Sequence, residues 1–525
     1  MPYSGPMGPV IPSLWSHALG ILGIALVFLG PLPLSLRLAA KGPGSSLSLF
    51  IIRSGLLWWL MQTVLAQALG AAGLYGGPAI LGLEALLLTA GLRMPSPPHR
   101  VWKVPEDPVF RALAGFQICL GSAYLWRSFE HPLHQFDNLW YQLPTLALWI
   151  QEGSFKTLAH LGPAGCLPFS FEALSGLAVA VDGSDFPAAA PVVLAWGLGQ
   201  AALYRACRAL GSSPRASLSV AALAFNAPLI LDLLATIKTD VPLMTLILMF
   251  LALTLEPASS KWAADLGLAG AALGFLAGTK ITGPVYALAL LAWTGLGWRR
   301  GQKASGPASA LWIPAAAGLA CGAFWFLRNL MQTGSPLGGT DESAIQGVRT
   351  WKAYFGGSLL ENFSWGEGRH WATLGRGWAE RFGFGGILLP TLVLIGLFTR
   401  KARVRETALA FVFLCFYIVT PLSGVSLDWP GNLFSFDMRY AFPFWALLGL
   451  LAASGIGNSK ILLMILPVTA ALQGAISGLR LLRPLDWAGG ACLAGLTVAL
   501  AWGGVDAVKQ NRPWKRKPNL AFVCL

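Results

Sequence analysis

Apolar runs of about 18 to 20 residues recur along the whole chain, and each is long enough to cross a hydrocarbon core of about 30 Å as a helix. Examples are residues 14–34, 108–126, 216–235, 311–327 and 487–505. They lack the period-two alternation of barrel strands, and within lipid every backbone amide must find its partner inside its own segment. The sequence therefore predicts an all-α polytopic membrane protein with about 13 transmembrane helices.

The composition excludes a water-facing globular surface. The chain of 525 residues is 55% hydrophobic and 11% charged, whereas soluble domains carry about 25% charged residues. Its net charge of +14 comes from basic residues at the ends of apolar runs, so nucleic acid is not an expected partner. The seven cysteines are scattered singly, which predicts small core residues rather than disulfides or a thiolate metal site.

Charge placement predicts the orientation in the membrane. Basic clusters mark alternate helix ends, which are cytoplasmic by the positive-inside rule, and most acidic residues lie at the opposite ends. We expect a multi-pass protein of a bacterial inner membrane with its acidic loops in the periplasm. The first run lacks a basic leader and a cleavage signal, so the mature helices themselves are expected to direct insertion. The basic clusters include Arg37 and Lys41, Arg93, Arg205 and Arg208, Arg299 and Arg300, Arg400 and Lys401, and the tail 509–517.

Three regions are predicted along the chain. Residues 1–107 form an N-terminal three-helix extension with a cytoplasmic linker, 108–456 the transmembrane core, and 457–525 the C-terminal helices with a basic tail. The core has two long outward loops, at about 127–186 and 328–384, which are expected to contain juxtamembrane helices and to roof a cavity. Within the first loop, residues 141–158 form an amphipathic segment that would place Trp140, Trp149 and Phe155 at the membrane interface.

The most informative stretch is residues 131–155, which reads HPLHQFDNLWYQLPTLALWIQEGSF. It resembles the first outer loop of the GT-C superfamily, polyprenyl-phosphate-sugar-dependent glycosyltransferases that include protein O-mannosyltransferases and aminoarabinose transferases. Bacterial members often read D-x-x-x-Y-H-L-P followed by W-I-Q-x-G-S. Asp137 and Tyr141 fit this pattern, whereas Gln142 replaces its histidine.

Further short motifs fit the same resemblance in the same order. They are PFSFEAL at 168–174, IKTDVP at 237–242, GFLAGTKITG at 274–283, WFLRNLMQTGSPL at 325–337 and DMRYAFP at 437–443. The resemblance covers about residues 110–455 and implies a GT-C-like fold with an inverting glycosyltransferase site at the outer face. The implied partners are a polyprenyl-phosphate sugar donor, a lipid, glycan or protein acceptor, and membrane lipids. A Gly-rich nucleotide loop is not found in the sequence, so a nucleotide cofactor is not expected.

Sugar transfer to a hydroxyl needs a base held near the acceptor, and Asp137 is our candidate. Glu172 and Asp240 are expected to orient Asp137, to pair with Lys280 or to bind a cation. A divalent metal held by Asp137 and Asp240 stays an open alternative. So do two simpler interpretations: Asp137 capping the following helix, and Lys238 and Asp240 as solvated residues of an outward turn.

The departing phosphate gains negative charge, which fixed cations would stabilise. Lys280, Arg328 and Arg439 lie at the outer ends of apolar segments and are the candidates, with Tyr141 and Tyr440 as substrate-binding residues. Lys280 could instead extend to the interface, and both arginines could be interface anchors.

The histidines and tryptophans of the outer loops carry weaker signals. His131 and His134 have a spacing that suits a metal only if the segment is helical, and Pro132 argues against that. Trp351, Trp365, Trp371 and Trp378 could stack on sugars, but interface anchoring is the simpler interpretation.

Two other functions remain open from the sequence. A transporter or lipid flippase also carries ionisable residues in a helical bundle, but it would place them near mid-membrane rather than at the outer edge. A noncatalytic relative could keep the fold without the activity, which the replacement at Gln142 would suit.

Overall fold

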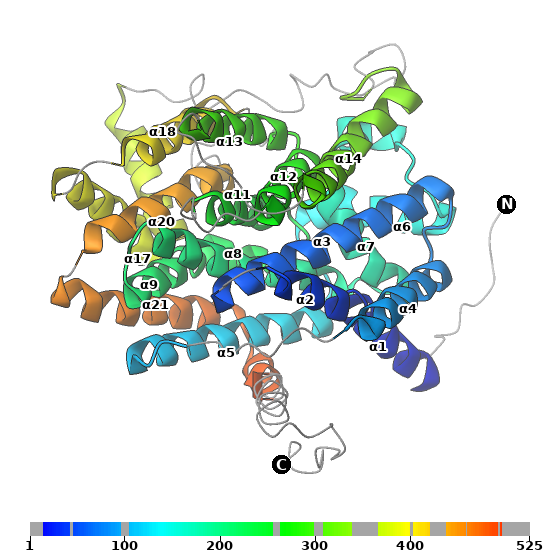
Figure 1. Cartoon of the computed structure of the whole chain (residues 1–525), viewed down its shortest axis with the longest axis horizontal. Coiled ribbons are helices and arrows are strands. Elements are labelled where there is room, and N and C mark those ends of the chain that lie inside the picture. The colour runs from blue at the N-terminus through cyan, green and yellow to red at the C-terminus, as the bar shows by residue number, and fades with distance from the viewer. Residues whose placement is uncertain are drawn as a thin grey trace.

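The computed structural model describes residues 14–42, 46–95, 104–255, 263–298, 308–338, 366–399, 403–420, 437–457, 459–491 and 494–495. All regular structure in these ranges is helical, which confirms the all-α prediction (Figure 1). Residues 339–365 of the second outer loop, with Trp351 and Trp365, and the basic tail lie outside the described residues.

The described elements are helices, which follow one another along the chain. The α-helices are α1 (Leu14–Leu29), α2 (Leu32–Ala40), α3 (Leu47–Ala72), α4 (Gly77–Arg93), α5 (Pro108–Glu130), α6 (Leu143–Glu152), α7 (Ser170–Asp182), α8 (Ala190–Ala209), α9 (Pro214–Phe225), α10 (Pro228–Leu233), α11 (Asp240–Thr254), α12 (Ala263–Thr279), α13 (Gly283–Trp298), α14 (Ala308–Thr333), α17 (Gly368–Thr399), α18 (Val404–Val419), α20 (Phe442–Ile456) and α21 (Lys460–Leu481). Shorter turns of helix are the π-helix η1 (Asn138–Gln142) and the 3-10 helices η2 (Ala159–Cys166), η3 (Phe186–Ala189) and η5 (Asp437–Ala441).

Many of these helices have the length and composition of membrane spans. Within the described ranges, eight are at least 18 residues long and apolar enough to cross a bilayer, and three further apolar helices are shorter. The chain is therefore an integral, multi-pass membrane protein. The expected number of about 13 spans stays a prediction.

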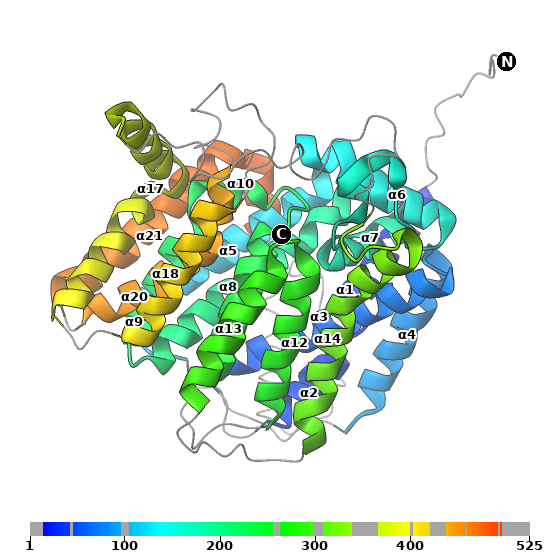
Figure 2. The ribbon, with the colours of Figure 1, turned by 90° about the horizontal axis from the view of Figure 1, so that it is seen from above.

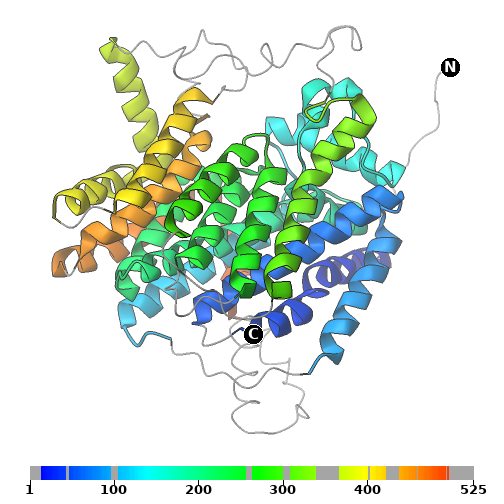
Figure 3. The same ribbon diagram turned by 45° about the horizontal axis from the view of Figure 1, so that its top comes forward.

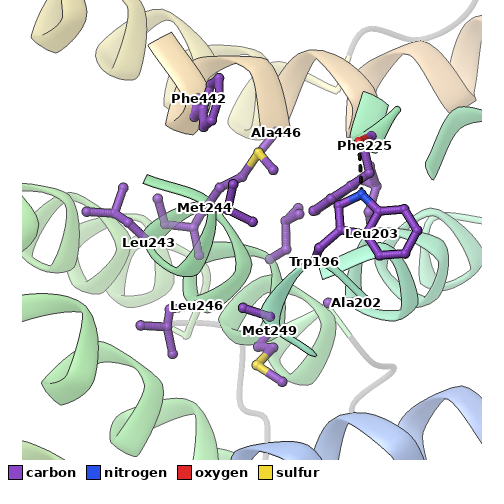
Figure 4. Packing of buried hydrophobic residues seen from close by; sticks show 14 of the residues in the cluster. Trp196, Ala202, Leu203, Phe225, Leu243, Met244, Leu246, Met249, Phe442 and Ala446 are labelled. Carbon is purple, nitrogen blue, oxygen red and sulfur yellow. Dashed lines mark hydrogen bonds between the residues drawn. The ribbon is translucent and has the colours of Figure 1, made fainter. Parts of the chain in front are cut away.

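Helix α11 lies at the centre of the bundle. Every residue from Asp240 to Thr254 is buried, and the helix packs against α8, α12 and α20. Figure 4 shows this packing: Met244 and Met249 of α11 lie among Leu203 of α8, Phe225 of α9 and apolar residues of α20. The Trp196 indole N–H donates to the Phe225 carbonyl at 2.9 Å, so a polar group of this apolar core is satisfied. Because α11 begins at Asp240, its position fixes one residue of the predicted site.

Helices α12 and α14 approach each other through glycines and run side by side in Figure 2. A Cβ added at Gly274 would lie 2.0 Å from the carbonyl carbon of Gly318, and one at Gly322 would lie 2.1 Å from the Gly274 oxygen. Small residues at such crossings let the two backbones approach closely. Membrane helices gain van der Waals contact in this way, because in lipid the hydrophobic effect does not drive their association.

The N-terminal helices pack into the bundle. Helix α3 contacts α7, α8, α12 and α14. Arg53 of α3 makes a bidentate pair with Asp265 of α12, with both N–O distances 2.6 Å and both side chains buried. The region boundary predicted at residue 107 stays a prediction, but α3 is in contact with the core along its length.

The first outer loop contains helical turns, as expected, but two of its aromatic residues are not at the surface. Trp140 is exposed, whereas Trp149 and Phe155 are buried. These two rings stack on Trp325 of α14 at centroid distances of 5.5 and 5.3 Å. The expectation that Trp149 and Phe155 would be exposed to lipid was therefore wrong, because the loop packs these rings onto α14.

The α12–α14 crossing gives a test of the packing. Replacing Gly274 by Leu would insert a side chain where even a Cβ meets backbone atoms, so we expect the thermal unfolding temperature in detergent to fall by several degrees or the folded yield to collapse. Gly295→Leu in α13 is the matched control, since a Cβ there meets nothing within 4 Å. Equal stability of the two variants would contradict the close crossing.

Candidate active site at one end of the helix bundle

The predicted site residues come from connections between helices at one end of the bundle. Asp137 immediately precedes η1, and Asp240 is the first residue of α11. Lys280 lies in the turn between α12 and α13, where the Gly283 N–H donates to the Lys280 carbonyl at 2.8 Å. Arg439 lies in η5. In Figure 3, η1 and α6 lie in the cyan segments at the upper edge of the bundle.

The opposite end of α5 has a different polar pair. Arg215 pairs with Asp107 at 2.6 Å just before α5 begins, while Asp137 follows its other end. A helix of the length of α5 spans about 35 Å. The two polar groups are therefore separated by about one membrane thickness.

The Asp137 carboxylate lies between two cations. Its Oδ2 is 2.8 Å from the Lys238 Nζ and 3.1 Å from an Arg439 guanidinium nitrogen. The Lys238 side chain is only 3% exposed. The interpretation of Lys238 and Asp240 as solvated turn residues is therefore wrong: both are buried and paired.

A second ion pair adjoins the first. The Lys280 Nζ is 2.5 Å from Asp240 Oδ1, and it also lies 4.2 Å from the centroid of the Tyr440 ring. The Arg439 guanidinium is over the same ring at 5.3 Å. Tyr440 thus connects the two pairs through cation–π contacts. Three cations and two carboxylates leave this cluster, which we call the charged cluster, with one excess positive charge.

Access to the charged cluster is uneven. Side-chain exposure is 21% for Asp137 and 18% for Lys280, against 5% for Asp240. Asp137 and Lys280 are therefore the most accessible carboxylate and ammonium of the charged cluster, while their partners are more deeply buried.

Electrostatics keep Asp137 ionised. Burial alone would raise the pKa of its carboxyl, but the charges of Arg439 and Lys238 outweigh that and hold the pKa below its usual value. For Lys238 the balance is reversed: burial and the nearby Arg439 lower its pKa to about 8, against the opposing effect of Asp137. Lys238 thus remains mostly charged at neutral pH. Groups with perturbed pKa values gathered in one cluster are typical of functional sites.

Glu172 of α7 lies beside the charged cluster, and its burial favours the neutral carboxyl. Burial raises its pKa to about 8, and the charges of Lys280 and Asp240 reach it with opposite effects. Its Oε1 accepts from the Gln142 amide at 3.3 Å, and the same amide donates to the Ile237 carbonyl at 3.3 Å. Gln142 therefore ties η1 to α7 and to the segment that carries Lys238.

Two other predicted residues, Arg328 and Tyr141, contact aromatic side chains. The Arg328 guanidinium lies over Trp325 at 4.9 Å and donates to Asn329 Oδ1 at 2.7 Å; among the described contacts, none joins it to the charged cluster. Its donor-phosphate role stays a prediction. Tyr141 is half-buried between Trp140 and Phe169, next to the Asp137 turn.

A divalent ion held by Asp137 and Asp240 does not fit this arrangement. One oxygen of each carboxylate, Asp137 Oδ2 and Asp240 Oδ1, already contacts ammonium or guanidinium groups, and an added metal would face three cations at close range.

The comparisons with known proteins bear on this site. Residues 168–321 match the family model of the dolichyl-phosphate-mannose-protein mannosyltransferases, a stretch that includes Glu172, Lys238, Asp240 and Lys280. The chain resembles a GT-C glycosyltransferase. This confirms the resemblance inferred from the motifs, over those residues.

One solved structure is similar, the crystal structure of ArnT from Cupriavidus metallidurans bound to undecaprenyl phosphate. It aligns with a TM-score of 0.46 and 15% identity, covering 79% of this chain and 68% of that one. A search of curated protein sequences gave no match.

The protonation of Glu172 can be tested through stability. A pKa raised from 4.5 to about 8 means that the folded wild type loses stability as pH rises through this range, because the unfolded chain ionises first. Glu172→Gln removes this titration. The difference between the thermal unfolding midpoints of the variant and the wild type should therefore increase in favour of the variant between pH 5 and 8 and stay constant above pH 8. The exposed Glu106→Gln is the control; the same pH dependence in both variants would contradict a buried neutral Glu172.

Proposed function

We propose that this chain is a membrane glycosyltransferase that moves a sugar from a polyprenyl-phosphate carrier to an acceptor hydroxyl at the periplasmic face of a bacterial inner membrane. The single observation that carries the proposal is one cluster of charges at the helix ends that contains both an accessible carboxylate, Asp137, and an accessible cation, Lys280, linked through Arg439 and the Tyr440 ring. The match to the dolichyl-phosphate-mannose-protein mannosyltransferase family model supports a sugar donor that is linked to a lipid phosphate.

The proposed reaction is a single displacement that inverts the anomeric carbon. The acceptor oxygen forms a bond to that carbon, the bond from the carbon to the phosphate oxygen breaks, and the carrier phosphate leaves with the electron pair. Asp137 takes the acceptor proton, which a carboxylate can do when it is within hydrogen-bond reach. The low pKa of Asp137 keeps it unprotonated before each turnover.

The cations of the charged cluster suit the leaving group. Lys280, with Tyr440 beneath it, is the accessible positive group, and Arg439 lies on the same ring. A fixed cation close to the departing phosphate stabilises the charge that develops there. We propose that these groups, rather than a metal bound to Asp137 and Asp240, balance the phosphate.

The apolar surface beside Asp137 suits a lipid carrier. Phe136 is 73% exposed and stacks on Trp140, and Leu139 is also exposed on the same short helix. Aromatic side chains of this kind favour the membrane interface. A polyprenyl chain reaching the site from the outer leaflet would pass along this surface.

The alternative functions make different demands on these residues. A transporter or flippase would need its ion pairs along a path through the bundle, whereas Asp137, Asp240, Lys280 and Arg439 are all at helix ends. A noncatalytic relative would have no need of an accessible carboxylate held ionised between two cations.

Removing the carboxylate tests the function. Asp137→Asn should lower sugar transfer from a radiolabelled polyprenyl-phosphate donor at least about 100-fold, as loss of a general base does. The measurement uses purified protein in detergent with a membrane extract as the acceptor pool. Glu152→Gln, an exposed carboxylate on α6, is the control. Transfer by Asp137→Asn at the wild-type rate would remove Asp137 from the mechanism, and no transfer by the wild type with any donor would favour the other functions.

Lys238 gives a prediction about pH. Lys238→Met removes one of the two charges that lower the pKa of Asp137, so the acid limb of kcat/KM should move to higher pH by about one unit. Lys238→Arg keeps the charge and should leave the limb near its wild-type position. The other charges facing Asp137, chiefly Arg439, are unchanged in both variants. A limb that stays in place in Lys238→Met would show that Asp137 is not the titrating base.

A further inference from the structure

A group of metal-ligating side chains lies outside the charged cluster, where α5 ends. Glu130 and His131 of the α5 terminus meet Asp486, which belongs to the helical residues 484–491 that follow α21. One ligand atom from each residue lies within 4.8 Å of the others. The proposed sugar transfer uses none of these three residues.

The fold holds the two halves of this group together. A Cβ at Gly490 would lie 2.4 Å from the Ala123 Cα, so the segment after α21 crosses α5 at backbone distance. Gly489 packs in the same way on the Trp126 ring. Asp486 is fully buried, and its Oδ2 accepts from the Arg483 N–H at 2.6 Å. The Asp486 carboxylate is therefore fixed in place, and its Oδ1 is directed toward His131.

The distance between the imidazole and this carboxylate matches a shared metal. His131 Nε2 and Asp486 Oδ1 are 3.3 Å apart, which is longer than the usual N–H···O hydrogen bond of about 2.9 Å. In tetrahedral zinc sites, with bonds of about 2.0 to 2.1 Å, the ligand atoms are separated by about 3.3 Å. Glu130 is exposed and can supply a third ligand by a small side-chain movement, which leaves a fourth position for water.

We propose that Glu130, His131 and Asp486 form a zinc site that joins the outer end of α5 to the C-terminal helical segment. Nitrogen and carboxylate ligands together are a set that zinc accepts. The site lies at the start of the segment from residue 131 to Asp137. Within this segment the Leu133 N–H donates to Asp185 Oδ2 at 2.9 Å. Zinc there would have a structural role and would fix the start of the segment that carries Asp137. This role does not depend on the sugar-transfer reaction.

The experiment uses full-length protein in detergent, stripped with a chelator, desalted and titrated with zinc chloride against a chromophoric competitor. We expect the wild type to bind one equivalent of Zn²⁺ more than His131→Gln or Asp486→Asn. The affinity of that equivalent should fall at least about 100-fold in either variant, because even the loss of a residue that only supports a ligand costs 10- to 100-fold. The thermal midpoint of the wild type should rise with zinc, and Co²⁺ should give the visible absorption of a tetrahedral site.

His134→Gln is the matched control, since His134 is exposed and lies three residues away, outside the group. It should bind zinc as the wild type does. If Asp486→Asn does not fold, because the Arg483 cap is weakened, His131→Gln and Glu130→Gln decide the matter. Equal binding by the wild type and His131→Gln would overturn the proposal and leave an ordinary histidine–aspartate hydrogen bond. Weak binding shared by all variants would overturn it as well, since it would show adventitious sites only.

Discussion

The contact between Asp137 and its two cations is the interaction on which the candidate site depends. Lys238 approaches from the segment before α11 and Arg439 from η5, so one carboxylate holds three separate parts of the chain together. Taking charges out of water is costly, and replacing a buried ion pair by apolar residues is often neutral or stabilising. An arrangement with three cations and two carboxylates at the helix ends is therefore better explained by function than by stability.

The packing of the helices that carry the charged cluster explains why its charged groups keep their positions relative to one another. Asp240 begins α11, the most buried helix, and Lys280 follows α12, which is fixed against α14 by glycines at backbone distance. Closely packed helices have low compressibility, so the positions of their ends relative to one another vary little. The segments at this end of the bundle can then hold charged groups at contact distances, although Asp137 and Lys280 lie between helices rather than within them.

Much of this could be predicted from the sequence, and the failures have identifiable reasons. Hydropathy alone predicts the helical membrane fold, and the short motifs identify Asp137, Asp240, Lys280 and Arg439, which the structure brings together. The role of Lys238 was left open, although IKTDVP contains it, because a single sequence does not show whether a turn faces water or η1.

Other features depend on contacts between distant segments. Trp149 and Phe155 have the pattern of interface residues, and only their packing on Trp325 shows that they are buried. His131 could be paired from the sequence only with the neighbouring His134, whereas its partner in the structure is Asp486, 355 residues away. Periodicity and local motifs carry no information about such pairs.

The most direct test of the account is a double-mutant cycle on Asp137 and Lys238, read out as kcat/KM for transfer from a polyprenyl-phosphate sugar. If Lys238 acts only by holding and tuning Asp137, adding Lys238→Met to Asp137→Asn should cause no further loss, because residues that act as a unit are strongly non-additive. Losses that multiply in the double variant would contradict the account, since they would mean that Lys238 acts on the reaction independently of the carboxylate it contacts.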